Sequence, residues 1–389
     1  MPFCLKKCSY CDFYSISTLS LLPAYVSALQ QEIEMRTGKF DRPGSTPKKV
    51  GTIYFGGGTP SLLPLSDVKK ILQTICACYQ VARDAEITLE VNPGTVDKIY
   101  LAGLKKLKVN RLSIGVQSFD AHKIKVLGRI HTIEASIEAI QAAKSVGFEN
   151  IGLDLIYGTP GETREDWLRD LKTALGFKVA HLSCYMLTLE KGTPLQTQYA
   201  KGLFKAPGPD LLTDLFMATS TFLGQQGYEH YEISNFARGR ENRSRHNANY
   251  WQMTPYEGFG PSAHSFGFLR NKENHFPASP VRFWNIADVG AYIESLSSSL
   301  LPIQEREVLN VQQQMLEHVM LGLRTSDGLD MSALETMMGQ AYLTQVVPLL
   351  FLLETQKLGA IGSDRRFALT LSGRAHLDSI VEAFADIIL

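Results

Sequence analysis

The chain has 389 residues, 44% hydrophobic and 20% charged, a composition typical of a folded globular protein. Lysine plus arginine equals aspartate plus glutamate, at 39 each, so the charge gives no support for bulk binding to nucleic acid or acidic membranes. No apolar run reaches the roughly 18–20 residues that span a bilayer, and the start does not read as a secretory signal. The six cysteines lie unevenly along the chain, which favours a reducing cytoplasm and metal binding over a disulfide framework.

The first half of the chain alternates between apolar, β-branched runs and segments with helical periodicity. The runs expected to be strands are residues 50–55, 87–91, 111–116, 151–157 and 181–189. The segments expected to be helices are residues 67–79, 96–107, 133–146 and 164–175. Continuous apolar strands between helices predict a parallel α/β sheet covered on both faces, and the repeat is typical of a (β/α) barrel.

Glycines and polar residues follow the ends of these predicted strands. They are Gly56-Gly57-Gly58-Thr59-Pro60, Glu90 with Asn92-Pro93, Gln117-Ser118-Phe119, and Asp154 with Gly158-Thr159-Pro160-Gly161. In a (β/α) barrel the carboxyl ends of the strands carry the chemistry, so these groups are expected to share one rim. Any single cluster could also be an ordinary turn.

The pattern changes near residues 206–209. Helical periodicity resumes over residues 211–223, and an aromatic, polar stretch covers residues 228–268. Beyond about residue 280 we expect mostly helix, then a short hairpin near residues 361–371 and a last helix from Gly373. We therefore predict a barrel domain at residues 1–240 and a smaller, mainly helical domain at residues 241–389. Helix–hairpin–helix is similar to a winged helix, but the neutral charge argues against DNA binding.

Cys4, Cys8 and Cys11 are the strongest chemical signal in the sequence. Three thiolates with spacings of three and two residues can hold three irons of a [4Fe–4S] cluster, which leaves the fourth iron free for a small molecule. Structural zinc is the alternative, but it prefers four closed ligands. Cys76 and Cys78 lie on a predicted helix, where their thiols would point apart, and with Cys184 they are expected to be buried small residues.

The spacing CxxxCxxC, with an aromatic residue before the third cysteine, resembles the signature of radical-SAM proteins. GGGTP, EVNP, GVQSF, LGRxH and DLIYGTPGET follow in order, as in the oxygen-independent coproporphyrinogen III oxidase-like group. The resemblance spans nearly the whole chain and implies an incomplete (β/α) TIM-like barrel with a smaller helical C-terminal domain. It implies a cluster on the three cysteines, and S-adenosylmethionine in contact with Tyr10, Gly57, Gly58, Thr59, Glu90, Gln117, Arg129 and Asp154.

The chemistry of these residues agrees with that implication. Glycines allow close approach of the backbone to a ligand. The carboxylates of Glu90 and Asp154 can accept bonds from an ammonium group or from ribose hydroxyls, and Arg129 can pair with a ligand carboxylate. The alternatives are a salt bridge at the strand ends for the two acids and a solvated charge for Arg129.

Two features separate the subgroups of this family. True oxidases carry a further cysteine two residues after the third, where this chain has Phe13. The heme-chaperone subgroup has phenylalanine there and an HNxxYW motif, which matches His246-Asn247-Ala248-Asn249-Tyr250-Trp251.

Imidazole is a good axial ligand for heme iron, and Tyr250 and Trp251 offer flat faces to a porphyrin. The resemblance thus implies heme binding by His246, Asn247, Tyr250 and Trp251. His264 is a competing ligand, and a structural histidine in an aromatic core is the alternative.

The resemblance has one departure. The family has a strand before the first cysteine, whereas this chain begins Met1-Pro2-Phe3, so a barrel edge is expected to be unpaired. A start assigned too late explains this better than a trimmed or impaired chain.

The resemblance therefore implies a cytoplasmic heme chaperone that uses a [4Fe–4S] cluster and S-adenosylmethionine and passes heme to an acceptor protein, such as a respiratory haemoprotein. An electron donor such as flavodoxin or ferredoxin is implied, with no nucleic acid and with any membrane contact made through the acceptor. Oxidative decarboxylation of coproporphyrinogen III is the main alternative. A ferredoxin-type electron carrier is another, but those proteins are small and use four cysteines.

Overall fold

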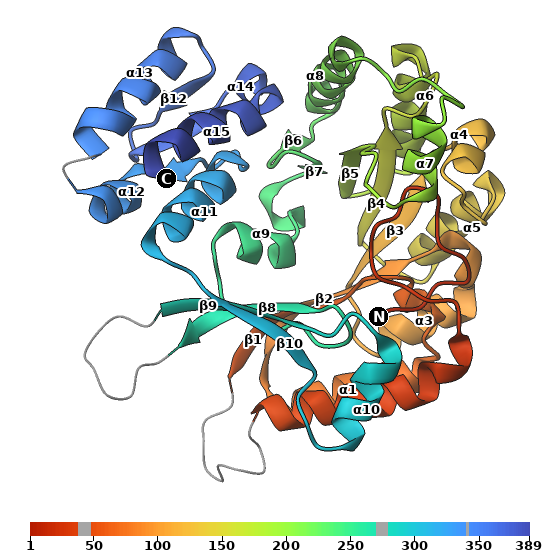
Figure 1. The fold of residues 1–389 in the computed structure, drawn as a ribbon. Coiled ribbons are helices and arrows are strands. Elements are labelled where there is room, and N and C mark those ends of the chain that lie inside the picture. Colours follow the sequence, from red (N-terminus) through yellow and green to blue (C-terminus); the bar gives the residue numbers. More distant parts are fainter. Residues whose placement is uncertain (38–47, 270–278, 340–341) are drawn as a thin grey trace. The chain divides into compact units, whose positions relative to one another are not determined.

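The computed structural model describes residues 1–37, 48–269, 279–339 and 342–389, which pack as two compact units (Figure 1). The first unit comprises Met1–Pro207, Glu257–Ser265 and Arg282–Arg306. The second unit comprises Gly208–Tyr256, Phe266–Val281 and Glu307–Leu389. The division of the chain into domains at residue 240 stays a prediction.

Five parallel strands form the core of the first unit. They are β1 (Lys49–Phe55), β2 (Gln80–Val91), β3 (Arg111–Gln117), β4 (Asn150–Tyr157) and β5 (His181–Met186), and they neighbour one another in chain order. Leu89, Leu112 and Leu153 on the central strands are fully buried, as expected for a sheet covered on both faces. β1 lies at one edge and the arrangement is open, so the predicted strands and the incomplete barrel are confirmed.

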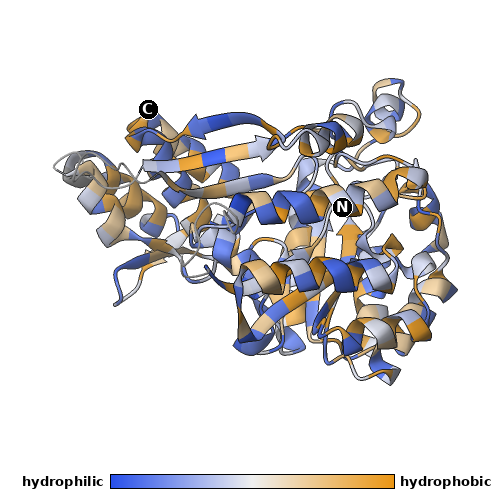
Figure 2. Ribbon diagram, turned by 90° about the horizontal axis from the view of Figure 1, so that it is seen from below, coloured by the Kyte–Doolittle hydropathy of each residue, from blue (hydrophilic) through white to orange (hydrophobic). Residues whose placement is uncertain are grey.

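Helices alternate with the strands, as the sequence pattern predicts. They are α1 (Leu22–Thr37), α2 (Leu65–Cys78), α3 (Lys98–Lys106), α4 (Ala121–Val126), α5 (Ile133–Ser145), α6 (Arg164–Gly176) and α7 (Pro194–Ala200). Side-chain caps mark their starts: Asp97 caps α3, Thr132 caps α5, and Thr163 forms a capping box with Asp166 on α6. The helices carry both hydrophobic and hydrophilic residues (Figure 2), and those that they bury are mostly apolar, such as Leu101 and Leu104 on α3 and Ile140 on α5.

A buried carboxylate ties α1 to the later segments of the first unit. Glu32 accepts hydrogen bonds from the Gly260 amide at 2.8 Å, from Asn285 Nδ2 at 2.7 Å and from the Tyr292 hydroxyl at 2.6 Å. Arg36, one turn further along α1, pairs with it at 2.8 Å. Tyr292 lies on α10 (Val289–Ser297), so residues far apart in the sequence complete this unit.

The second unit is mainly helical, as predicted. Its helices are α8 (Pro209–Gln225), α9 (Arg245–Trp251), α11 (Val311–Leu323), α12 (Met331–Met338), α13 (Val347–Thr355), α14 (Leu371–Ala375) and α15 (Leu377–Ile388). A short pair, β6 (Glu229–His230) with β7 (Asn235–Ala237), precedes α9. The predicted hairpin is β12 (Gly359–Ile361) with β13 (Arg366–Leu369), and β11 (Leu329–Asp330) pairs with β13. Phe367 and Phe384 are fully buried in its core.

One prediction is incomplete and one is wrong. The stretch after residue 280 is mostly helical, as expected, but β9 (Ser279–Asn285) and β10 (Ile303–Val308), which were not predicted, form a three-stranded sheet with β8 (His264–Leu269). Val281, Phe283 and Trp284 give β9 the β-branched and aromatic content of a strand, and helical periodicity overlooks it. Cys76 is exposed, whereas Cys78 and Cys184 are buried as predicted. α2 buries Val68, Ile71, Leu72 and Cys78, and position 76 falls off that face. Among the described helices, none is long and apolar enough to cross a bilayer.

Candidate functional site

The cysteine loop lies against the strand ends of the first unit. Phe3 is fully buried and packs edge-on against Tyr25, with ring centroids 5.3 Å apart. The Cys4 amide donates to the Ile16 carbonyl at 2.9 Å, and the Ile16 amide donates to the Pro2 carbonyl at 2.8 Å. These bonds close the loop at its base. Cys4, Cys8 and Cys11 are free thiols, each partly exposed.

Each of the three sulfurs has a hydrogen-bond donor from a different part of the chain. Thr59 Oγ1 donates to Cys4 Sγ at 3.4 Å, and Arg129 Nη1 donates to Cys8 Sγ at 3.4 Å. Burial raises the pKa of the Cys11 thiol, and the backbone hydrogen bond from Phe13 opposes this shift. Donors of this kind favour thiolate ligands. Within the described ranges, no three His, Cys, Asp or Glu side chains are grouped for a single metal ion. In a cubane cluster each cysteine binds a separate iron.

The glycine loop after β1 approaches the cysteine loop closely. The Gly58 amide donates to the Met1 carbonyl at 2.7 Å. A Cβ atom on Gly58 would come within 2.6 Å of the Phe3 carbonyl oxygen and 3.1 Å of Cys4 Sγ, so only glycine fits there. Gly57 has φ of +109°, which other residues rarely adopt. The GGGTP motif therefore serves close packing beside the cysteines.

Glu90, near the end of β2, and Asp154, in the middle of β4, are two half-buried carboxylates. Glu90 accepts hydrogen bonds from the Tyr54 hydroxyl at 2.8 Å and from the Gly57 amide at 3.1 Å. Burial raises the pKa of Glu90 to about 7, and the Asp154 charge adds to this rise. Burial also raises the pKa of Asp154, although it accepts bonds from Ser113 Oγ at 3.0 and 3.1 Å. Neither acid has a salt-bridge partner among the described residues, so a cationic ligand would relieve the cost of charging them.

Gln117 and Arg129 come together at the end of β3. Arg129 Nη2 donates to the Gly115 carbonyl at 2.9 Å, and a Cβ atom on Gly115 would lie 2.9 Å from Gln117 Nε2 and 3.4 Å from Arg129 Nη2. Gln117 has φ of +69°, a strained conformation for a residue other than glycine. The Nε atom of Arg129 is buried and has no partner in the described part of the chain. An unpaired guanidinium donor beside a cysteine sulfur suits a site for an anionic ligand group.

Tyr10 completes this set of predicted residues. Burial raises the pKa of its hydroxyl above the usual range, and the neighbouring Arg129 charge opposes the rise. The Cys8 and Cys11 charges also act on the ring hydroxyl. The structure thus brings Tyr10, Thr59 and Arg129 together at the cysteines, and it joins Gly57 to Glu90.

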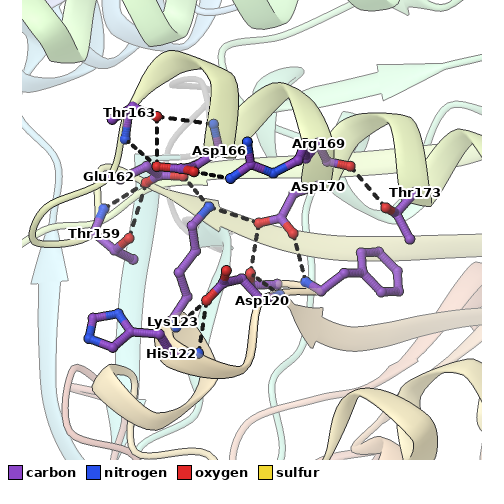
Figure 3. A network of polar contacts seen from close by, with 12 residues as sticks. Asp120, His122, Lys123, Thr159, Glu162, Thr163, Asp166, Arg169, Asp170 and Thr173 are labelled. Atoms are coloured by element: carbon purple, nitrogen blue, oxygen red, sulfur yellow. Dashed lines mark hydrogen bonds and ion pairs between the residues drawn. The ribbon is translucent and has the colours of Figure 1, made fainter.

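The sequence reasoning missed a buried ion network in the same loops. Ser118 of GVQSF and Glu162 of GTPGET contribute to it, together with Lys123 and Asp170 (Figure 3). The sequence contains only a weak sign of this network, namely Lys123 followed further along the chain by Glu162 and Asp170. Only the fold shows that they meet.

The HNxxYW residues lie on α9 in the second unit. Ser244 caps this helix by accepting a bond from the Asn247 amide at 3.2 Å. His246 Nε2 and the Tyr250 hydroxyl are 2.8 Å apart, and their rings meet edge to face. Burial lowers the pKa of His246 to about 4, so the imidazole is neutral near pH 7. A neutral imidazole is the form that binds a metal.

An arginine and a buried acid hold the last residue of this motif. The Arg324 guanidinium lies 4.7 Å from the ring centroid of Trp251, a cation–π distance. Arg324 Nε donates to Glu232 at 3.0 Å, and Glu232 is fully buried. Trp251 Nε1 is buried and lacks an acceptor in the ranges that the structure describes. This arrangement covers one face of the indole and leaves its N–H for a ligand acceptor.

His264, the competing heme ligand, belongs to the first unit. Its ring is exposed and stacks on Trp284, with centroids 5.5 Å apart and planes at 25°. His264 thus belongs to a different compact unit from His246, Tyr250 and Trp251.

Known proteins match this chain along most of its length. Residues 1–174 match the Radical SAM superfamily, and residues 309–376 match the HemN C-terminal domain. Heme chaperone HemW of Synechocystis sp. is 35% identical over 84% of this chain and 77% of its own length. The chain belongs to the HemW family of radical SAM proteins. Other HemW-like relatives include heme chaperone HemW of Mycobacterium tuberculosis, 33% identical over 86% of this chain and 82% of its own.

Two further comparisons concern a mitochondrial relative and a solved structure. Radical S-adenosyl methionine domain-containing protein 1, mitochondrial, of Danio rerio is 32% identical over 89% of this chain and 76% of its own length. Coproporphyrinogen III oxidase (HemN) of Escherichia coli, a radical SAM enzyme, superposes with a TM-score of 0.78 over 99% of this chain and 88% of its own. At 23% sequence identity this likeness shows the fold alone, and it confirms the predicted fold class.

Proposed function

We propose that this protein is a heme chaperone that carries a [4Fe–4S] cluster and S-adenosylmethionine and transfers heme to an acceptor protein. The curated relatives named heme chaperone HemW support this function, and so does the radical SAM match. Cys4, Cys8 and Cys11 would hold the cluster and leave one iron for S-adenosylmethionine. The cluster supplies one-electron chemistry when it is bound.

The residues around the cysteines fit S-adenosylmethionine by charge and by hydrogen bonding. Glu90 would accept from the ammonium group, which would favour its ionised form despite burial. Arg129 has an unpaired donor for the carboxylate. Asp154 would accept from the ribose hydroxyls, and Gly57 and Gly58 would allow close approach of the backbone. Tyr10, Thr59 and Gln117 would complete the contact set.

One observation carries the heme proposal: a neutral, largely desolvated imidazole among aromatic rings on one short helix. His246 is neutral at pH 7, the Tyr250 ring lies beside it with centroids 5.0 Å apart, and the Trp251 ring lies 6.4 Å from that of Tyr250. Together these groups offer an axial ligand and flat apolar surfaces, which are the two features that heme needs. Asn247, on the same helix, would add a polar contact.

Anaerobic reconstitution followed by heme titration tests this proposal. The protein is supplied with iron and sulfide, and heme absorbance is then followed in the same sample. We expect His246→Ala to weaken heme binding by about tenfold or more, since an axial bond is lost. His122→Ala, at an exposed position on α4, is the matched control and should titrate like the wild type. Identical titrations of the two variants would remove His246 from the heme site.

The oxidase alternative is tested with coproporphyrinogen III. Phe13 occupies the position where the oxidase subgroup has a further cysteine, and its side chain is 71% exposed. We expect reconstituted protein with reductant to form no vinyl product. Vinyl product in amounts that exceed the protein would overturn the chaperone proposal. An electron carrier of ferredoxin type would differ again, because S-adenosylmethionine would leave its cluster spectrum unchanged.

The partners follow from this function. Heme and a heme-acceptor protein are required, and an electron donor such as flavodoxin or ferredoxin would reduce the cluster. A respiratory acceptor would bring the protein to a membrane surface only through that acceptor, and we place the protein in the cytoplasm. Co-purification with heme-deficient candidate acceptors, scored by heme transfer, tests this part.

A further inference from the structure

A lysine is buried on α4 between two carboxylates. The Lys123 side chain is 5% exposed, and its Nζ atom lies 2.9 Å from Asp170 Oδ2 and in direct contact with Glu162 (Figure 3). Burial by itself would lower the pKa of Lys123, but the two carboxylates outweigh it and raise the pKa. A buried ammonium is costly unless it is paired, so this lysine is tightly constrained.

The two carboxylates are themselves fixed by the loops that follow β3 and β4. Glu162 accepts hydrogen bonds from the Thr159 amide at 2.9 Å and the Thr159 hydroxyl at 3.2 Å (Figure 3). It also accepts from the Gly158 amide at 2.7 Å. Asp170 accepts from Ser118 Oγ at 2.7 Å and from the Phe119 amide at 2.8 Å. Lys123 therefore joins α4 to the ends of two strands. Asp120 caps the same helix by accepting from the Lys123 amide at 3.0 Å.

The C-terminal end of α4 is hydrogen-bonded to the cysteine loop. Ser9 Oγ donates to the Val126 carbonyl at 2.8 Å, and the Ser9 amide donates to the Leu127 carbonyl at 3.2 Å. Gly128, with φ of +70°, leaves room for this contact, since a Cβ atom there would lie 2.9 Å from the Ser9 amide nitrogen. Arg129, next along the chain, donates to Cys8 Sγ. A helix of six residues, about 9 Å long, thus separates the ion network from the cysteine loop.

We infer that Lys123 is a positioning residue for the cluster: through α4 it holds Ser9 and Arg129 in place against Cys8. This inference rests on the proposed cluster site. The network touches no cysteine directly, so its effect passes through the backbone of α4. Releasing Lys123 frees α4 at one end and loosens the hydrogen bonds that hold the middle of the cysteine loop.

Cluster retention and the midpoint potential of the cluster test the inference. Reconstituted Lys123→Met should release iron to a chelator about fivefold faster than the wild type, the change expected for loss of one hydrogen bond. Its midpoint potential should also shift, because hydrogen bonds to the ligating sulfurs set that potential. Lys125→Met, exposed on the same helix, should match the wild type in both measurements.

A second variant guards against simple misfolding. Lys123→Met leaves two buried acids unpaired, which destabilises a protein strongly. The triple variant Lys123→Met, Glu162→Gln, Asp170→Asn removes all three charges and keeps acceptors for the loop amides. Leu101→Ala, fully buried on α3, serves as a variant that loses stability without touching α4. The triple variant should lose its cluster faster, whereas Leu101→Ala should retain it at temperatures where it stays folded.

A double-mutant cycle with Ser9→Ala tests whether the effect of Lys123 on the cluster passes through α4 and Ser9. Ser9→Ala removes the bond to Val126 at the far end of α4, so it should accelerate iron release in the wild type and add little in the triple variant. If the triple variant keeps its cluster and potential, the inference is wrong, although the cluster site stands. If the wild type takes up no cluster, the proposed function fails first.

Discussion

Thr59 occupies a position where one hydroxyl group should tune the electron chemistry of the cluster. Its side chain is buried, 6% exposed, and Oγ1 donates to Cys4 Sγ at 3.4 Å. A hydrogen bond withdraws charge from a ligating sulfur and so stabilises the reduced, more negative cluster. Thr59→Val keeps the shape of the side chain and removes the donor, so we expect the midpoint potential to become more negative.

The magnitude follows from the strength of the bond. A hydrogen bond to a charged group contributes about 1.5–3 kcal/mol, and only the difference between the oxidised and reduced states moves the potential. Because the distance from Thr59 Oγ1 to Cys4 Sγ is long, we take the hydrogen bond to be about 1 kcal/mol stronger in the reduced cluster than in the oxidised one. Because about 59 mV corresponds to a tenfold change for one electron, the expected shift is about −40 mV.

A redox titration of the reconstituted protein under nitrogen, followed by the EPR signal of the reduced cluster, measures this shift. Thr173→Val on α6 is the matched control, because among the described residues its hydroxyl bonds only the Arg169 carbonyl of its own helix. Thr59→Ser should restore most of the wild-type potential. A Thr59→Val potential within about 10 mV of the control, or above it, would refute the reasoning.

Three further predictions concern other parts of the molecule. Burial raises the pKa of Glu90 from 4.5 to about 7, so the folded apoprotein holds this proton more tightly than the unfolded chain and loses stability as the pH rises from about 4.5 to about 7. In urea unfolding, Glu90→Gln should reduce the fall in unfolding free energy over this pH range. An unchanged dependence of the unfolding free energy on pH would contradict the prediction. Trp167→Ala, fully buried on α6, should lower the unfolding free energy by about 3–5 kcal/mol in the same assay, and a loss below about 1 kcal/mol would show that it does not pack in the core. Arg324→Leu removes the cation over Trp251 and takes the arginine partner away from the Glu232 carboxylate. We expect altered fluorescence of the Trp251 indole and weaker heme binding. A heme titration equal to that of the wild type would show that Arg324 is not part of the heme site.

Much of the fold can be predicted from periodicity, and the errors have physical causes. The runs that become β1 to β5 are continuous and apolar because the sheet is covered on both faces, so they are easy to recognise. β9 is different, since it carries Arg282 between apolar residues in a stretch that we expected to be mostly helical. Short strands of this kind depend on their partners in the sheet more than on their own residues.

The candidate site divides in the same way. Spacing along the chain makes Cys4, Cys8 and Cys11 recognisable, because ligands in one loop need no knowledge of the rest of the molecule. Pairing over long distances leaves no comparable pattern. The bond from Thr59 to Cys4 spans 55 residues, and the pair of Lys123 with Asp170 spans 47.

The sequence by itself determines the local chemistry of this protein: which loop can ligate iron, which strands are buried, and which helix presents an imidazole beside aromatic rings. These properties arise from neighbours within a few residues, and their periods and spacings are written along the chain. The tertiary structure alone decides which donors reach the sulfurs of Cys4 and Cys8, that the buried Nε atom of Arg129 has no partner among the described residues, and that α4 links an ion network to the cysteine loop. Those contacts exist only once parallel strands bring the loops at their carboxyl ends to one edge of the sheet.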